Sequence, residues 1–132
     1  MIDFSFLSPV QDRLVDQIEL LHGQAIGKKL SVHSSKGTPE LEGVKIAIVG
    51  VLESRNSVDH IGEEFQLNEI RKAFYKLFPG NWLHGMADLG DIQKGASVED
   101  TYFALIEVVS SLVKANIIPL IIGACTQQKQ GS

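Results

Sequence analysis

The chain has 132 residues, of which 44% are hydrophobic and 21% charged, a composition that is typical of one globular domain and excludes a disordered chain. Its net charge of −4 gives no reason to expect nucleic acid or an anionic membrane as a partner. The single cysteine excludes an internal disulfide, and no apolar run reaches the ~20 residues of a membrane helix. The first residues also lack a signal-peptide pattern, so we predict a cytoplasmic location.

Residues 1–43 are predicted to hold one helix and a connector. Ser8 and Pro9 form a typical helix start, because serine caps a helix and proline suits its first position. Residues 27–43 are rich in lysine, serine, glycine and proline, which favours a connector. Between these segments, apolar residues recur at helical spacing: Val10, Leu14, Ile18 and Leu21.

Residues 44–123 are predicted to form the core of the fold. Residues 44–51 (VKIAIVGV) are β-branched and almost wholly apolar, which is the pattern of a central parallel strand. A second, shorter strand is predicted over residues 83–87, and it leads into a turn at residues 88–91 (DLGD). A helix between these strands is indicated by apolar residues at helical spacing: Leu67, Ile70, Phe74 and Leu77.

The aspartates Asp88 and Asp91 have two interpretations. Two carboxylates three residues apart could bind a hard cation. Aspartate in a tight turn more often accepts hydrogen bonds from neighbouring backbone N–H groups. Because no third or fourth metal ligand accompanies the pair, we favour the turn.

A long amphipathic helix and a last strand complete the pattern. Residues 117–123 (IIPLIIG) form an apolar run that is typical of a buried parallel strand, which needs cover on both faces. Pro119 lacks a backbone N–H and so suits the end or edge of a sheet. Residues 124–132 form a polar tail, and residues 126–132 have neither helical nor strand character. The preceding helix ends near Asn116, and its apolar residues are Val98, Tyr102, Leu105, Ile106, Val109, Leu112 and Val113.

The order helix, strand, helix, strand, helix, strand predicts right-handed parallel crossovers. The expected fold class is therefore α/β, a partial three-layer α/β/α sandwich in which the first strand lies between the other two. Three strands are few for a parallel sheet that is covered on both faces.

The candidate binding residues Arg55, Asn56 and His60 follow the first strand, at the edge where open α/β sheets bind their ligands. Arginine can grip a carboxylate bidentately, and asparagine can both donate and accept hydrogen bonds. The alternative is a solvated loop with Asn56 in a turn. No glycine-rich phosphate loop and no metal-ligand spacing of histidines is present. Cys125 has no histidine close in sequence, so an ordinary free thiol is favoured over a nucleophile.

Several of these segments occur in a characteristic order. They are residues 45–51 (KIAIVGV), 55–56 (RN), 68–71 (NEIR), 87–92 (ADLGDI) and 117–123 (IIPLIIG). The series resembles the arginase/agmatinase/formimidoylglutamase family, the ureohydrolases. In that family the first strand is followed by a substrate loop and then by three motifs in this order: Gly-Pro-x-x-Ile-Arg, Asp-Leu-Gly-Asp and Pro-Leu-x-Leu-Gly-Gly-Asp-His. The resemblance covers residues 44–123 and is closest to the formimidoylglutamase branch, whose substrate loop carries an Arg-Asn pair.

This resemblance implies a three-layer sandwich around a parallel sheet of about eight strands. It also implies hydrolysis of a linear amidine or guanidine C–N bond with two manganese ions, whose bridging hydroxide is a strong nucleophile at neutral pH. The chain departs from the family after Gly123, where Ala124, Cys125 and Thr126 stand and no Asp-His follows. The Gly-Pro before the Ile-Arg pair is also missing. No metal ligand and no catalytic residue is therefore carried over.

We expect this chain to be the amino-terminal portion of such a hydrolase, acting on a formimidoylglutamate-, agmatine- or arginine-like substrate. Arg55, Asn56 and His60 are the expected substrate contacts. The isolated chain is expected to be inactive and to hold no manganese. The alternative is a small non-enzymatic α/β module that self-associates or binds a protein partner through an exposed strand edge at residues 117–122.

Overall fold

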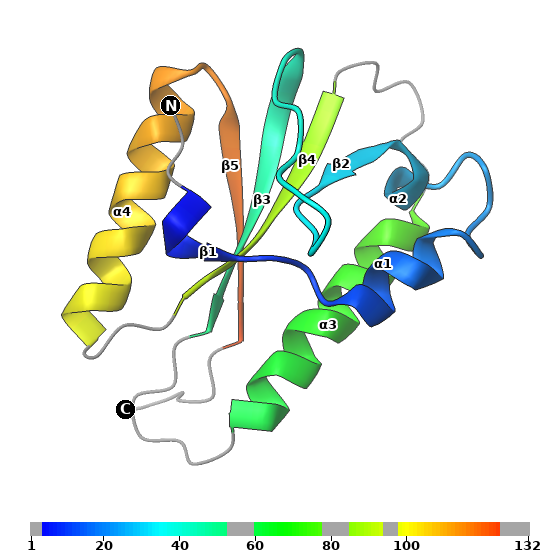
Figure 1. Cartoon of the computed structure of the whole chain (residues 1–132), viewed down its shortest axis with the longest axis horizontal. Coiled ribbons are helices and arrows are strands. Elements are labelled where there is room, and N and C mark those ends of the chain that lie inside the picture. Colours follow the sequence, from blue (N-terminus) through cyan, green and yellow to red (C-terminus); the bar gives the residue numbers. More distant parts are fainter. Residues whose placement is uncertain (1–3, 53–59, 78–84, 94–97, 125–132) are drawn as a thin grey trace.

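The computed structural model describes residues 4–52, 60–77, 85–93 and 98–124. In this part of the chain, no helix is both long and apolar enough to cross a membrane. The fold is mixed α/β (Figure 1). Its elements are η1 (Phe4–Phe6), β1 (Leu7–Ser8), α1 (Asp12–Ile18), α2 (Ile26–Lys29), β2 (Leu30–Val32), β3 (Val44–Leu52), α3 (His60–Lys76), β4 (Gly85–Ile92), α4 (Val98–Lys114) and β5 (Ile118–Ala124).

The described strands form one five-stranded, mostly parallel sheet in the order β1-β4-β3-β5. β3 runs parallel to both β4 and β5, which confirms the predicted α/β class and the predicted central place of the first long strand. β5 stands at one end of this order, where the missing N–H of Pro119 is easily accommodated. The outer edge of β4 is shared by two short strands, because β2 pairs with it in parallel and β1 pairs antiparallel with its last residues.

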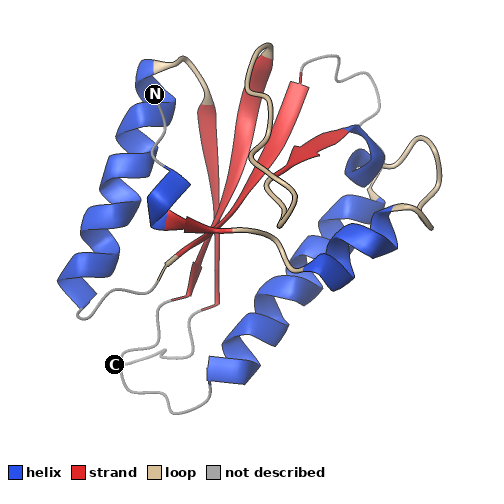
Figure 2. Ribbon diagram, in the orientation of Figure 1, coloured by secondary structure: helices blue, strands red, loops and turns tan. Residues whose placement is uncertain are grey.

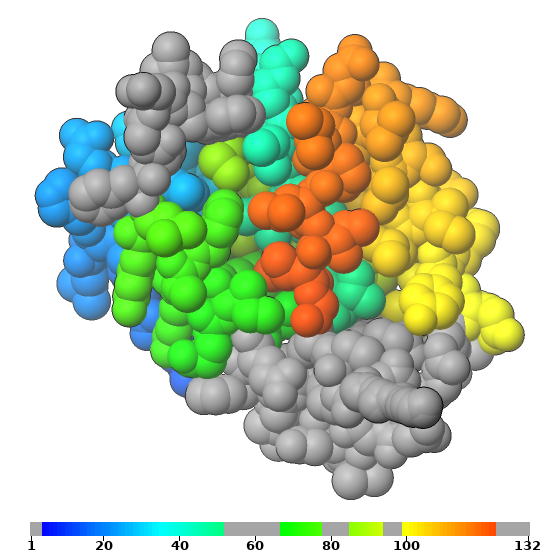
Figure 3. Space-filling model, turned by 180° about the vertical axis from the view of Figure 1, so that it is seen from behind, coloured from blue at the N-terminus to red at the C-terminus, as the bar shows by residue number. Residues whose placement is uncertain are grey.

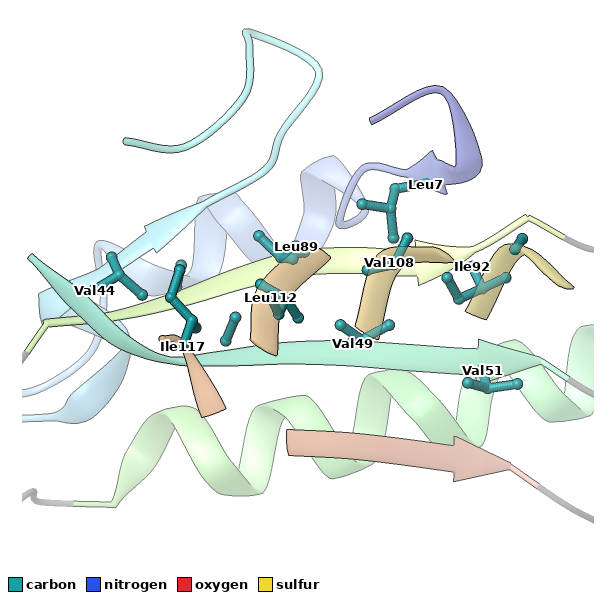
Figure 4. Close-up of a cluster of buried hydrophobic side chains, with 12 residues drawn as sticks. Leu7, Val44, Val49, Val51, Leu89, Ile92, Val108, Leu112 and Ile117 are labelled. Carbon is teal, nitrogen blue, oxygen red and sulfur yellow. The ribbon is translucent and has the colours of Figure 1, made fainter. Parts of the chain in front are cut away.

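Helices lie on both faces of the sheet (Figure 2). The face toward α4 carries the main apolar core, because alternate residues of β3 and β4 point to that side (Figure 4). The opposite face is covered by α3, with α1 and α2 packed beside it. The main core consists of Leu7, Val44, Ala47, Val49, Val51, Ala87, Leu89, Ile92, Ala104, Val108, Leu112 and Ile117.

The buried stripe of α3 differs from the one that apolar spacing predicts. Leu67 is buried as expected, but Ile70 and Leu77 are exposed. Arg71 and Tyr75 follow Leu67 at successive intervals of four residues, and these three buried residues form the side of α3 that faces the sheet. The prediction was wrong because Arg71 finds carboxylate partners on β4, which allows a charged residue to replace an apolar one on the buried face.

Helix α4 is apolar around much of its circumference, and its predicted stripe is only partly correct. Leu112 is buried as predicted, together with Ala104 and Val108. The predicted core residues Tyr102, Ile106 and Val113 are exposed instead. A helix with apolar residues on two sides offers two candidate faces, and spacing alone does not select between them.

The amino-terminal region contains more regular structure than its composition predicts. Ser8 belongs to β1 and does not cap a helix, since α1 begins at Asp12 after Gln11. The predicted connector includes part of α2 and the three residues of β2. Strands of two or three residues are too short to show the alternating pattern by which strands are recognised in a sequence.

Candidate functional site

A buried cluster of charged and polar side chains joins α3 to β4. Arg71 is 1% exposed and grips Asp88, which is 0% exposed, through two hydrogen bonds. In these bonds the Nε of Arg71 donates to Oδ2 at 2.8 Å and its Nη2 donates to Oδ1 at 3.0 Å. The Nη1 of Arg71 also donates to Oδ1 of Asp91 at 2.7 Å. One guanidinium therefore bridges two carboxylates that belong to the same strand.

Two further donors complete the coordination of Asp88. The hydroxyl of Tyr75 donates to Oδ2 of Asp88. The backbone N–H of Gly90 donates to Oδ1 at 3.1 Å. This local bond is the one that the turn interpretation of Asp88 predicts. The turn itself is wrong, however, because residues 88–91 lie inside β4.

A bulge in β4 brings both aspartates to the same face of the sheet. Residues three apart on a regular strand point to opposite faces, so Asp88 and Asp91 could not otherwise share a partner. The pairing with β3 matches Ile48 to Asp88 and Gly50 to Asp91, which leaves one extra residue on β4. Gly90 adopts φ +93°, and a Cβ at this position would collide with the backbone oxygen of Ser8. Glycine is required here for both reasons.

Strand β3 is shaped to receive the cluster. A Cβ on Gly50 would collide with Oδ1 of Asp91 and would lie 3.3 Å from Nη2 of Arg71. The absence of a side chain at Gly50 therefore lets the ion pair lie directly against the β3 backbone. Gly50 is two residues before Leu52, the last residue of β3, so the cluster contacts β3 close to its carboxyl end.

Burial and charge act against each other in this cluster. Burial disfavours the charge of Arg71, but the attraction of Asp88 and Asp91 outweighs it and holds the pKa of the guanidinium above its usual value. Burial, together with the negative charge of Asp88, raises the pKa of the Tyr75 phenol, which therefore remains a hydrogen-bond donor. Burial raises the pKa of Asp91 even though Arg71 favours its charged form.

The arrangement is suited to holding elements in place. The hydrogen bonds of the cluster join side chains of α3 to side chains of β4. Arg71, Tyr75 and Asp88 are almost fully buried. Asp91, at 19% exposed, is the member that reaches furthest toward solvent. We interpret the cluster as a polar latch that fixes α3 against the carboxyl-terminal parts of β3 and β4.

The predicted contact residues are only partly within the described chain. Arg55 and Asn56 lie outside the described residues, as does Cys125. His60 is the first residue of α3, but its side chain lies outside what the structure describes. The three predicted contacts therefore remain a prediction. Another histidine, His33, is buried on the edge of β4, where its Nδ1 lies 2.9 Å from the carbonyl oxygen of Leu89.

Sequence reasoning did not select Arg71 and Tyr75 as members of a site. The signal that could have identified them is the spacing of Leu67, Arg71 and Tyr75, which places an arginine on the buried side of a helix. Asp88 and Asp91 follow in the next strand as its available partners. Among the described residues, no group of three or more His, Cys, Asp or Glu side chains is suited to hold a metal ion, so no further ligand accompanies Asp88 and Asp91 there.

Comparison of the chain with protein-family models, with curated proteins and with solved structures gives no match. Any statement on its function therefore rests on its residues and geometry.

Proposed function

We propose that this chain is the amino-terminal part of an arginase-like hydrolase of linear amidine or guanidine C–N bonds, and that it supplies substrate contacts. The observation that carries the proposal is the latch. Two of the segments on which the ureohydrolase resemblance rests are residues 68–71 and 87–92. Arg71 of the first segment binds both aspartates of the second. Motifs that are distant in sequence thus meet in one structural unit, which supports treating them as one signature.

The position of the latch gives this signature a role. Ligands of open α/β sheets bind beyond the carboxyl ends of the strands. The latch contacts β3 at Gly50, near that end, and it also holds α3. Arg55 and Asn56 belong to the segment of the sequence that connects β3 to α3. The latch therefore fixes the two elements between which the proposed contacts stand in the sequence.

The proposed substrate contacts follow from side-chain chemistry. The guanidinium of Arg55 would bind the carboxylate of a formimidoylglutamate- or arginine-like substrate through two parallel hydrogen bonds. The amide of Asn56 would donate to and accept from polar groups beside it. His60 follows as a third polar contact. For an agmatine-like substrate, which has no carboxylate, Arg55 offers no such bond, so the proposal favours carboxylate-bearing substrates.

The described residues do not fit the pair of manganese ions of the resembling family. A hard divalent ion needs several oxygen or nitrogen ligands, and no group of three suitable side chains occurs in this part of the structure. The two aspartates of the latch are directed to Arg71. In this proposal the metal ligands come from other residues of the protein, and no chemical step is assigned to the described side chains.

A substrate titration tests the proposed contacts. Formimidoylglutamate, arginine and agmatine are titrated into the 132-residue chain and binding is followed by nuclear magnetic resonance. We expect weak binding of the two carboxylate-bearing compounds. Arg55→Ala should weaken it at least about tenfold, as expected for loss of a charge-assisted hydrogen bond.

Arg13→Ala is the matched control, because it removes an exposed arginine from α1 and should leave the affinity unchanged. Equal affinity of the original chain and the Arg55→Ala variant, or no binding of any of the three compounds, would refute the proposed contacts.

A further inference from the structure

The charges of the latch do not balance. Arg71 carries one positive charge, whereas Asp88 and Asp91 each carry a negative charge when both are ionised, and the phenol of Tyr75 is neutral. In Figure 3, which shows the molecule from behind, α3 lies at the surface. The latch lies on its inner side, where Arg71, Asp88 and Tyr75 are almost fully buried. One surplus negative charge in such a place is unfavourable, because water does not compensate it.

The surplus charge belongs to Asp91. Asp88 accepts two hydrogen bonds from Arg71, one from the hydroxyl of Tyr75 and one from the backbone N–H of Gly90. From the described residues, the carboxyl group of Asp91 accepts one bond, and its donor is the same guanidinium that Asp88 engages at two points. Because donated hydrogen bonds stabilise the charged form of a carboxyl group, Asp88 is the partner that balances Arg71.

The neighbours of Asp91 offer no second cation within the part of the chain that the structure describes. From α3 and β4, the charged and titratable side chains that face it are the other members of the latch. Ser8 on β1 and Gly50 on β3 lie opposite Asp91 in the two strand pairings, and neither is titratable. His33, which follows β2, bonds to the carbonyl oxygen of Leu89 instead. A proton on Asp91 itself is therefore the simplest way to neutralise the cluster.

We propose that the latch is a proton-dependent switch in which Asp91 is the switching group. With a proton on Asp91 the cluster is electrically neutral, and Oδ1 of Asp91 still accepts the bond from Arg71 while Oδ2 carries the proton. Loss of the proton places a surplus negative charge beside Asp88. Asp91 is 19% exposed, so its ionised carboxylate can turn toward water and release the Nη1 of Arg71.

The switch has a permanent part and a proton-controlled part. The two bonds between Arg71 and Asp88 do not involve Asp91, so they hold α3 on β4 in both states. Oδ1 of Asp91 is the latch atom closest to the space that the missing side chain of Gly50 leaves on β3. Movement of this carboxylate therefore loosens the contact of the latch with β3. Burial, helped by the negative charge of Asp88, raises the pKa of Asp91, which extends the tight state to higher pH.

This inference does not rest on the proposed hydrolase activity, because it uses only the latch and the strands beside it. Nuclear magnetic resonance of the side-chain carboxyl carbons of the 132-residue chain, followed over a series of pH values, tests the proton. The carboxyl carbon of Asp91 should titrate at a pH above the ordinary aspartate pKa of about 3.9. A titration at or below that value would overturn the inference.

Hydrogen exchange of the backbone amides of α3 tests the switching. In the original chain their protection relative to unstructured amides should fall severalfold as the pH rises through the titration of Asp91. Asp91→Asn should abolish this fall, because the side-chain amide stays neutral and still accepts a bond from Arg71. Glu69→Gln is the matched control, since it neutralises a carboxyl group of α3 that is 47% exposed and should leave the fall in place. Protection that depends on pH equally in the original chain and in Asp91→Asn would overturn the switch, and the titration of the original chain decides the proton even if the variant does not fold.

Discussion

Replacing Arg71 by alanine should destabilise the fold by about 3–5 kcal/mol, the cost of removing one partner from a buried ion pair. The structure explains why the cost lies in this range. Arg71 makes three charge-assisted hydrogen bonds, two with Asp88 and one with Asp91. Asp88 is 0% exposed, so without Arg71 its carboxylate would lose its counter-charge in a place that water does not reach.

This loss is large compared with the whole stability of a domain, which is typically about 5–15 kcal/mol. Urea denaturation measures it directly. With a slope of about 2 kcal/mol per molar urea, a loss of about 4 kcal/mol lowers the midpoint by about 2 M. Original chain and variant are compared at one protein concentration, so that mass action does not contribute to the difference.

Lys72→Ala is the matched control for this experiment. Lys72 is the next residue on α3, and its ion pair with Glu69 at 3.0 Å is partly exposed to solvent. Such pairs contribute only about 0–1 kcal/mol. Arg71→Lys retains the charge but not the planar fork that binds Asp88 at two points, so its cost should lie between those of the two alanine variants. If Arg71→Ala costs less than about 1 kcal/mol, or no more than Lys72→Ala, the latch does not hold α3 on the sheet.

Three further outcomes follow from the same geometry. Gly90→Ala should lower the free energy of unfolding by at least about 1–3 kcal/mol in urea denaturation, because Gly90 has a positive φ and its Cβ would meet Ser8. Gly23→Ala is the control, since Gly23 has open space around it, and should change stability by less than about 0.5 kcal/mol. Equal effects of the two variants would contradict the bulge. The pKa of Asp91 is raised in the folded chain, so the folded state binds the proton of this carboxyl more tightly than the unfolded state does. The stability of the original chain relative to Asp91→Asn should therefore fall as the pH rises above the ordinary pKa of aspartate. A stability difference that stays flat or rises with pH would count against the burial of this carboxylate. Calorimetric titration of the isolated chain with manganese should show no stoichiometric sub-micromolar binding, and such binding would show that the chain holds a metal site of its own.

The apolar strands β3 and β5 could be predicted from the sequence, whereas the strand predicted over residues 83–87 covers only the start of β4. β3 and β5 are nearly continuous apolar runs, which identifies both as strands and places β3 in the middle of the sheet. The predicted burial of the last strand was wrong, because β5 lies at the end of the strand order and exposes Ile118, Leu120 and Ile121. β4 contains Asp88, Gly90 and Asp91, residue types that favour turns, but they lie in a strand that pairs with β3, and Arg71 binds both carboxylates. A pattern within one segment cannot report a partner that another segment supplies.

The same limit applies to the candidate site. Arg71 interrupts the apolar spacing of α3, so a rule that selects apolar residues places Ile70 and Leu77 inside and Arg71 outside. Its burial depends on two carboxylates that the bulge at Gly90 turns toward it. Arg55 and Asn56, by contrast, were selected for their chemistry and for their place after β3, and they remain a prediction.

We propose that this chain supplies the substrate contacts of an arginase-like hydrolase. The measurement that tests it most directly is steady-state hydrolysis of formimidoylglutamate and arginine by the full natural protein that contains this sequence, supplied with manganese, with and without the double change Arg55→Ala and Asn56→Ala. The account predicts hydrolysis by the unchanged protein and a Michaelis constant at least about tenfold higher in the double variant. Absence of hydrolysis, or a Michaelis constant that the double change leaves unaltered, would contradict it.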